Sequence, residues 1–282
     1  ANNTAVGSNA LFSNTTASNN TSVGFQALYA NTTGTNNVAV GYAALDAITT
    51  ASNSTAVGYN ALTADTAGLN AAFGYTAGAA ITTGTRNTAV GPAALDAATT
   101  GDDNTALGAN AMGATTTASD NTAVGSYAMA VNTTGASNVA VGYAALDANT
   151  TGGSNVAIGG SALTANTTAS SNVAVGHNSM VANSTGTNNV AVGVNSLDAN
   201  TTAAHNTAVG YNALTANSTG ASNVAVGAYA LAANTTANSN QAFGYAAMEN
   251  NTTGTRNTGI GYGTLRANTT ADDNAALGYD AL

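Results

Sequence analysis

The chain lacks cysteine, tryptophan and lysine, and only 5% of its 282 residues are charged. The absence of cysteine excludes a disulfide framework and a thiolate metal site. Three arginines against twelve acids leave a net charge of -9, so there is no basic surface for nucleic acid or for an anionic membrane. No apolar run is long enough to span a membrane, and no signal peptide is visible. Direct membrane insertion of this segment is therefore not expected.

A short phrase, Asn-Val-Ala-Val-Gly-Tyr, recurs along the chain, for example at residues 138–143. Its glycine occurs at positions 7, 24, 41, 58, 74, 91, 108, 125, 142, 159, 176, 193, 210, 227, 244, 261 and 278. Successive glycines are 17 residues apart, except Gly58 and Gly74, which are 16 apart. A fixed period this short is typical of a solenoid, in which each repeat is one coil that is stable only when stacked on its neighbours.

The residues before this motif glycine predict a β-strand that is covered on both faces. In Val139-Ala140-Val141, valine alternates with alanine, so both sides of the strand are apolar. We expect the alanine column to fill a narrow coil interior. The column directly before the glycine, which holds Val, Leu, Ile or Phe, is then left to face another copy of the chain. The pattern predicts an all-β fold, a parallel β-solenoid of about 17 coils that requires association between copies.

Asparagine stands four places before the motif glycine in every coil except one, which has Ser54. In a parallel stack these amides lie about 4.8 Å apart and can hydrogen-bond along the axis as a ladder. The glycine is expected at a corner that needs positive φ or a close approach of backbones. The residues predicted to form this structural ladder are Asn20, Asn37, Asn138, Asn155, Asn172, Asn189, Gly24, Gly41, Gly142, Gly159, Gly176 and Gly193.

No linker or shift in composition divides the chain, so residues 1–282 are predicted to form one elongated repeat domain, about 77 Å long at one strand spacing per coil. The one shortened repeat changes the turn at residues 64–69 and leaves the strand phrase intact. Neither end carries a capping segment, and joining the chain head to tail would leave a turn about six residues short. We therefore expect a section of a longer fibre.

No enzymatic, cofactor or metal site is predicted. His177 and His205 occupy different places in the coil and are interpreted as surface residues. A phosphate-binding loop of the usual kind is excluded by the absence of lysine. The acid pairs at 102–103 and 272–273 lie in turns and are considered only as weak cation sites. A recurrent acid column has its members three coils apart, too far to hold one metal ion. This column consists of Asp46, Asp96, Asp147 and Asp198.

Three surface features leave alternatives open. Tyrosine follows the motif glycine at positions 42, 59, 75, 143, 211, 245, 262 and 279. We interpret this stripe as covering a groove between chains, with binding of a sugar or a partner surface as the alternative. Thr-Thr pairs in the turns raise an ice-binding alternative, although adjacent turn threonines cannot both lie on one flat face. N-glycosylation sequons occur at Asn31, Asn149, Asn183 and Asn234, so surface glycans are a further alternative.

The phrase Asn172-Val173-Ala174-Val175-Gly176, continued to Ser179, resembles the head repeats of YadA-type trimeric autotransporter adhesins. With its Asn-Thr-Thr-Gly turns, the chain is still more similar to the repetitive shafts of phage tail-fibre-like proteins. The coil is three residues longer than the usual adhesin head repeat. The resemblance covers the whole chain and implies a left-handed parallel β-roll, three chains side by side, and a location on a cell or virion surface.

Together, these observations predict a non-enzymatic extracellular structural fibre or adhesive stalk, a homo-oligomer with the trimer favoured. The alternatives are a phage tail-fibre shaft, an appendage filament that stacks end to end and, from a different class, an ice-binding solenoid. The predicted partners are further copies of the chain and a surface glycan or receptor. No cofactor and no nucleic acid is expected.

Overall fold

The computed structural model describes residues 2–282, in which all regular secondary structure is β-strand. None of these residues belongs to a helix long and apolar enough to cross a membrane. The chain divides into two units, one ending at Asn138 and the other beginning at Val139. The strands of the first unit are β1 (Thr4–Val6), β2 (Thr21–Val23), β3 (Val38–Val40), β4 (Thr55–Val57), β5 (Ala71–Phe73), β6 (Thr88–Val90), β7 (Thr105–Leu107) and β8 (Thr122–Val124).

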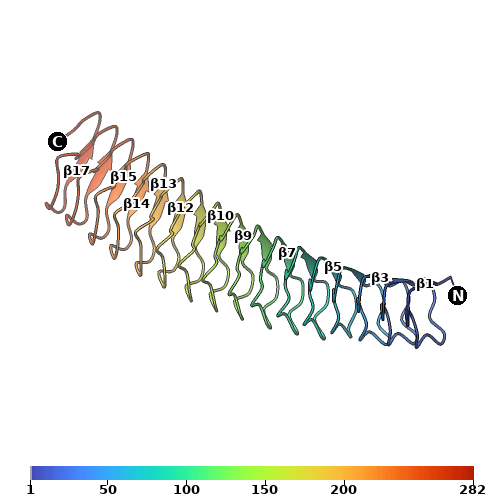
Figure 1. The fold of residues 1–282 in the computed structure, drawn as a ribbon. Coiled ribbons are helices and arrows are strands. Elements are labelled where there is room, and N and C mark those ends of the chain that lie inside the picture. The colour runs from blue at the N-terminus through green and yellow to red at the C-terminus, as the bar shows by residue number, and fades with distance from the viewer. Residues whose placement is uncertain (1) are drawn as a thin grey trace. The chain divides into compact units, whose positions relative to one another are not determined.

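The second unit is built in the same way. Its strands are β9 (Val139–Val141), β10 (Val156–Ile158), β11 (Val173–Val175), β12 (Val190–Val192), β13 (Thr207–Val209), β14 (Val224–Val226), β15 (Gln241–Phe243), β16 (Thr258–Ile260) and β17 (Ala275–Leu277). Within each unit, every strand pairs in parallel with the strand of the next coil (Figure 1), as when Ala174 of β11 lies opposite Ala191 of β12. The predicted all-β parallel β-solenoid with 17-residue coils is confirmed in both units.

The interior of each coil is narrow and mostly apolar. In the coil of β3, Ala39, Ala44 and Leu45 are fully buried, whereas Val38 and Val40 of the same strand are only partly covered. The strand therefore points its alanine inward and its larger side chains outward, as the alternation of the sequence predicts. The leucine four places after the glycine supplies most of the apolar volume inside the coil.

Each coil turns through several residues in the left-handed region of φ. In the coil of β3 these are Asn36 (φ 60°), Ala43 (φ 48°) and Leu45 (φ 51°), in addition to Gly41. A left-handed conformation costs a residue with a Cβ roughly 1–2 kcal/mol, so other interactions must hold it. Hydrogen bonds between coils do so: the Ala43 N–H donates to the carbonyl of Phe25 at 2.9 Å, and the Leu45 N–H donates to that of Ala61 at 3.1 Å.

Candidate functional site

The most prominent surface feature is an apolar stripe, defined here as the residues directly before and directly after each motif glycine. Within residues 2–282, nearly all exposed large apolar side chains belong to it, for example Phe73, Ile260 and Tyr262. The exceptions are Phe12, Leu69, Tyr127, Val131 and Leu282. Neither column contains an acid or an arginine, although the chain carries a net charge of -9. Concentration of apolar exposure in one uncharged strip is typical of an interaction surface.

Strand geometry produces this stripe. The residue before the glycine directly follows the inward alanine, so it points to the opposite face of the strand, away from the coil interior. Phe73 of β5 and Ile260 of β16 are each 42% exposed, while their neighbours Ala72 and Gly259 face inward. The expectation that this column is left over once the coil closes is confirmed for the single chain. In the single chain this column is exposed in some coils, as at Phe73, and half-buried in others, as at Val40.

Aromatic rings after the glycine form a ladder in each unit. The first unit's ladder is Phe25, Tyr42, Tyr59 and Tyr75, with centroid separations of 5.3, 5.1 and 5.4 Å and interplanar angles of 12–15°. The second unit's ladder is Tyr211, Tyr229, Tyr245, Tyr262 and Tyr279. In the coil that has Ala228 after its glycine, the next residue, Tyr229, supplies the ring and makes edge contacts on both sides.

Ring stacking limits what these ladders can bind. Tyr59 has a nearly parallel ring at 5.1 Å on one side and another at 5.4 Å on the other, so both of its faces are occupied. A sugar that packs on an aromatic residue needs a free ring face. The ladders offer ring edges and phenolic hydroxyls instead. This geometry favours packing against a protein surface over sugar stacking.

The asparagines four places before the glycine are buried and bonded mainly to backbone. Asn20 Oδ1 accepts the N–H of Asn37 at 2.8 Å, and its Nδ2 donates to the carbonyl of Gly34 at 2.8 Å. Asn172 Oδ1 accepts the N–H of Asn189 at 3.0 Å in the same way. The other predicted ladder residues also bond between coils: Asn138 N–H donates to Asn121, and Asn155 Nδ2 donates to the carbonyl of Ala169.

The predicted ladder glycines all have φ between 135° and 139°. A Cβ on Gly176 would collide with the carbonyl of Gly193 in the next coil, and the other ladder glycines meet the following motif glycine in the same way. These positions are Gly24, Gly41, Gly142, Gly159, Gly176 and Gly193.

A second buried asparagine column, seven places after the glycine, was missed by the sequence analysis. Here amide bonds to amide: Asn200 Nδ2 donates to Asn183 Oδ1 at 2.7 Å, and Asn234 Nδ2 donates to Asn217 Oδ1 at 2.9 Å. The signal in the sequence is the recurring asparagine of the Asn-Thr-Thr turns, which also belongs to a sequon. Five coils have another residue at this place: Ile48, Asp65, Ile81, Ala98 and Thr115. Asn31, Asn149, Asn183 and Asn234 are fully buried, so these sequons do not present an amide for a glycan in the folded chain.

The shortened coil departs from asparagine in both columns, and the two substituting residues contact each other. Ser54 replaces the first asparagine, Asp65 replaces the second, and Ser54 Oγ donates to Asp65 Oδ2 at 3.1 Å. Asp65 Oδ1 accepts the N–H groups of Ala67 and Gly68 at 3.0 and 3.1 Å. Burial raises the pKa of Asp65 above its ordinary value in spite of these hydrogen bonds.

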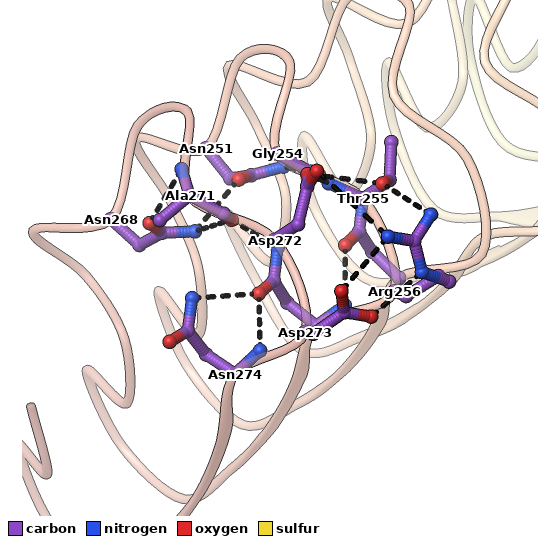
Figure 2. A network of polar contacts seen from close by, with 11 residues as sticks. Asn251, Gly254, Thr255, Arg256, Asn268, Ala271, Asp272, Asp273 and Asn274 are labelled. Atoms are coloured by element: carbon purple, nitrogen blue, oxygen red, sulfur yellow. Dashed lines mark hydrogen bonds and ion pairs between the residues drawn. The ribbon is translucent and has the colours of Figure 1, made fainter.

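The acid pairs considered as cation sites are engaged by arginine and threonine. Figure 2 shows the network of the second unit, in which Arg256 forms a bidentate pair with Asp273 at 2.7 and 2.9 Å. The Thr255 N–H donates to Asp272 at 2.7 Å. In the first unit Arg86 pairs with Asp103 in the same manner, at 2.6 and 2.7 Å.

These interactions leave the acids as ordinary surface ion pairs. The side-chain hydrogen bond from the arginine lowers the pKa of Asp103 and that of Asp273, and the bonds from Thr255 lower the pKa of Asp272. All three acids therefore stay ionised and already have donors, and residues 2–282 hold no cluster of three or more His, Asp or Glu suited to a metal ion.

The remaining polar candidates are not brought together. His177 lies in the apolar stripe and His205 in a turn, both exposed. Asp46 and Asp198 accept hydrogen bonds from Thr63 and Thr215, at 2.7 and 2.6 Å. Partial burial raises the pKa of Asp96 and that of Asp147. No pocket is present in the described part of the chain.

Most Thr-Thr turns expose only one of their two threonines; both are exposed at residues 15–16, 49–50 and 269–270. Thr32 Oγ1 donates to the carbonyl of Thr49 in the next coil at 3.1 Å, whereas Thr33 is exposed. The exposed members form a single file along the coils. Ordered arrays of hydroxyls in two dimensions are not formed by these turns.

Comparison with known proteins adds no assignment. No protein-family model matches the chain, and no curated protein matches it.

Proposed function

We propose that this chain is a non-enzymatic structural repeat protein that forms an extracellular stalk or shaft by association of identical copies, with three copies favoured. The single observation that carries the proposal is the apolar stripe, which runs from coil to coil in both units and whose large side chains the chain itself leaves exposed or half-buried. Stacked coils supply stiffness, because each coil is hydrogen-bonded to the next throughout each unit.

A second copy of the chain fits the stripe better than a globular partner does. Each copy carries a net charge of -9, so association through charged faces would bring like charges together. The stripe is the strip on which two copies can meet without this repulsion. A copy also has the same 17-residue period, so that its columns match in every coil, whereas a globular surface has no such period.

The mechanical role follows from how the polar groups are used. Buried asparagines bond to neighbouring coils, the acid pairs bind arginine or threonine, and the tyrosine ring faces are covered by one another. Residues 2–282 contain no pocket for a small molecule. Adhesion is assigned to the elements that such a stalk carries.

Light scattering of the purified chain tests the proposal. Val192→Asp combined with Ile260→Asp places charge in the stripe, and Thr185→Asp combined with Thr253→Asp places the same charge on exposed positions outside it. We expect the unmodified chain and the threonine variant to form oligomers and the stripe variant to lose them. Circular dichroism reports whether each variant is folded. A folded, stable monomer of the unmodified chain would contradict the proposal.

A further inference from the structure

We propose that the stacked tyrosines are sites of oxidative cross-linking, at which dityrosine bonds join successive coils of one chain. The pairs are Tyr42–Tyr59 and Tyr59–Tyr75 in the first unit, and Tyr245–Tyr262 and Tyr262–Tyr279 in the second. Both rings of each pair belong to the same chain, so coupling needs no second copy. It requires that the ladder is open to the oxidant, and we place it before the apolar stripe is covered by sister copies.

The rings of each pair are already held together. Their centroids are 5.1 and 5.4 Å apart in the first unit and 5.1 and 5.0 Å apart in the second, with interplanar angles of 7–14°. Parallel pairing of the strands keeps this distance, because equivalent residues of neighbouring coils are in register. Coupling of two groups fixed side by side avoids the entropic cost of bringing them together.

The rings are also accessible in the single chain. Tyr59 is 46% exposed, Tyr75 is 61% exposed and Tyr262 is 44% exposed. An oxidant can therefore reach the phenol edge. Partly exposed rings can rotate about their side-chain torsions to bring two ring carbons into contact.

The chemistry requires an external two-electron oxidant, for which we name hydrogen peroxide acting through a haem peroxidase. Each of two phenols loses one electron and one proton and becomes a phenoxyl radical. The two radicals join through a carbon–carbon bond between Cε atoms, ortho to the hydroxyls, and each ring returns the hydrogen of that carbon to its phenol oxygen. Hydrogen peroxide accepts the two electrons and two protons and leaves as two molecules of water.

The chain contains an internal control outside the apolar stripe. Tyr29, which is half-buried, stacks on Phe12 with centroids 5.5 Å apart and an interplanar angle of 7°, so its stacking geometry matches that of the ladder rings. Phenylalanine has no phenol to oxidise, and Tyr29 therefore has no partner for coupling within that stack. The same holds for Phe25 on Tyr42 at the end of the first unit's ladder. We therefore expect no cross-link between Tyr29 and Phe12 or between Tyr42 and Phe25.

Such bonds would provide a covalent staple in a chain without cysteine. Each bond closes a loop of one coil, 17 residues for Tyr42–Tyr59 and 16 for Tyr59–Tyr75. Closing the loop restricts the unfolded chain and opposes separation of the two coils. The expected consequence is greater resistance to heat and protease after oxidation.

Treatment of the folded full chain with peroxidase and hydrogen peroxide tests the proposal. Denaturing electrophoresis isolates the species with the mass of one chain, and cleavage before aspartate then separates Tyr42, Tyr59 and Tyr75 into different peptides, because Asp46 and Asp65 lie between them. We expect peptides joined at Tyr42–Tyr59 and Tyr59–Tyr75, with dityrosine fluorescence. The matched variant Tyr59→Phe keeps a ring in the stack and should lose both cross-links of the first unit while retaining those of the second.

Three results would overturn the proposal: no dityrosine in the folded chain, dityrosine only between chains, or cross-links that involve Tyr29 as often as the ladder tyrosines. Oxidation of the chain in urea serves as the reference for unselective coupling. If the folded chain gives the same distribution of cross-links as the unfolded chain, the stacking has no role and the inference fails.

Discussion

Buried asparagine side chains hold each coil to the next, through both the oxygen and the nitrogen of the amide. Asn172 accepts the N–H of Asn189 at 3.0 Å and donates to the carbonyl of Gly186 at 2.8 Å. Both partners are backbone groups of the following coil, so the side chain adds to the backbone bond that the Val173 N–H donates to the Asn189 carbonyl at 2.9 Å. An unsatisfied buried polar group costs about 1–3 kcal/mol, and each such asparagine prevents two of them.

Replacing this asparagine should therefore weaken the stack. We expect Asn172→Ala to lower the free energy of unfolding by about 3 kcal/mol, because the Asn189 N–H and the Gly186 carbonyl lose their partner. The midpoint of urea unfolding measures the effect. Thr185→Ala, at an exposed position, is the control and should change the midpoint little. Equal effects of the two substitutions would show that the amide has no special role.

Asp65 gives a prediction that depends on pH. Its pKa in the folded chain is raised above the ordinary value of 3.8 because burial disfavours the charged carboxylate. The buried carboxylate therefore lowers the free energy of unfolding at pH values above the folded pKa. This effect is absent below pH 3.8, where the carboxyl is protonated in both the folded and the unfolded state. Asp65→Asn should remove this cost and stabilise the chain at neutral pH, by about 1 kcal/mol.

Urea midpoints across the acidic and neutral range check this prediction. The gain from Asp65→Asn should be present at pH 7 and shrink as the pH falls through the folded pKa toward the ordinary one. The exposed Asp120→Asn is the matched control. A gain that stays constant with pH, or a loss at pH 7, would be inconsistent with a buried carboxylate whose pKa is raised.

At the scale of the single coil, glycine is required at the motif position for two reasons. Gly176 has φ 135°, a value that residues with a Cβ rarely adopt, and a Cβ there would meet the carbonyl of Gly193. We expect Gly176→Ala to cost about 3 kcal/mol or more. Gly160→Ala is the matched control, because that position lacks positive φ and its added Cβ would meet only the side chain of His177, at 3.3 Å.

Thermal or urea unfolding distinguishes the two glycine variants. The account requires that Gly176→Ala is strongly destabilising while Gly160→Ala is tolerated, as Ala228 is at the same place in another coil. Similar stability of the two variants would mean that close packing of successive corners is not required.

Sequence alone identified the coil, its strand and its corner glycine, because period-2 alternation and a fixed spacing depend only on residue type. The left-handed conformation of Leu45 could not be predicted, since leucine has no preference for positive φ and the conformation is imposed by bonds to neighbouring coils. The second asparagine column was missed for a related reason. An asparagine that recurs in turns has several explanations. Only the structure shows that Asn183 and Asn200 point inward and bond to each other.

The sequence also does not show which departures from the repeat contact each other. Ser54 and Asp65 are separate irregularities until the structure places their side chains 3.1 Å apart. Gly78 replaces the usual leucine, and Leu62 and Ile81 occupy the space, with Leu62 Cδ2 2.9 Å and Ile81 Cδ1 3.1 Å from where a Cβ on Gly78 would lie. Such contacts depend on which residue columns face each other inside the coil, and the spacing of the repeats does not show this.

For the molecule as a whole, the central claim is that the apolar stripe of each unit is covered by sister copies. The most direct measurement is the mass per unit length of the assembled particle, obtained from the scattering cross-section in solution. One chain contributes 17 residues for each strand spacing of about 4.8 Å. The account predicts about three times the value of a single chain. A folded particle with the mass per length of one chain would contradict it.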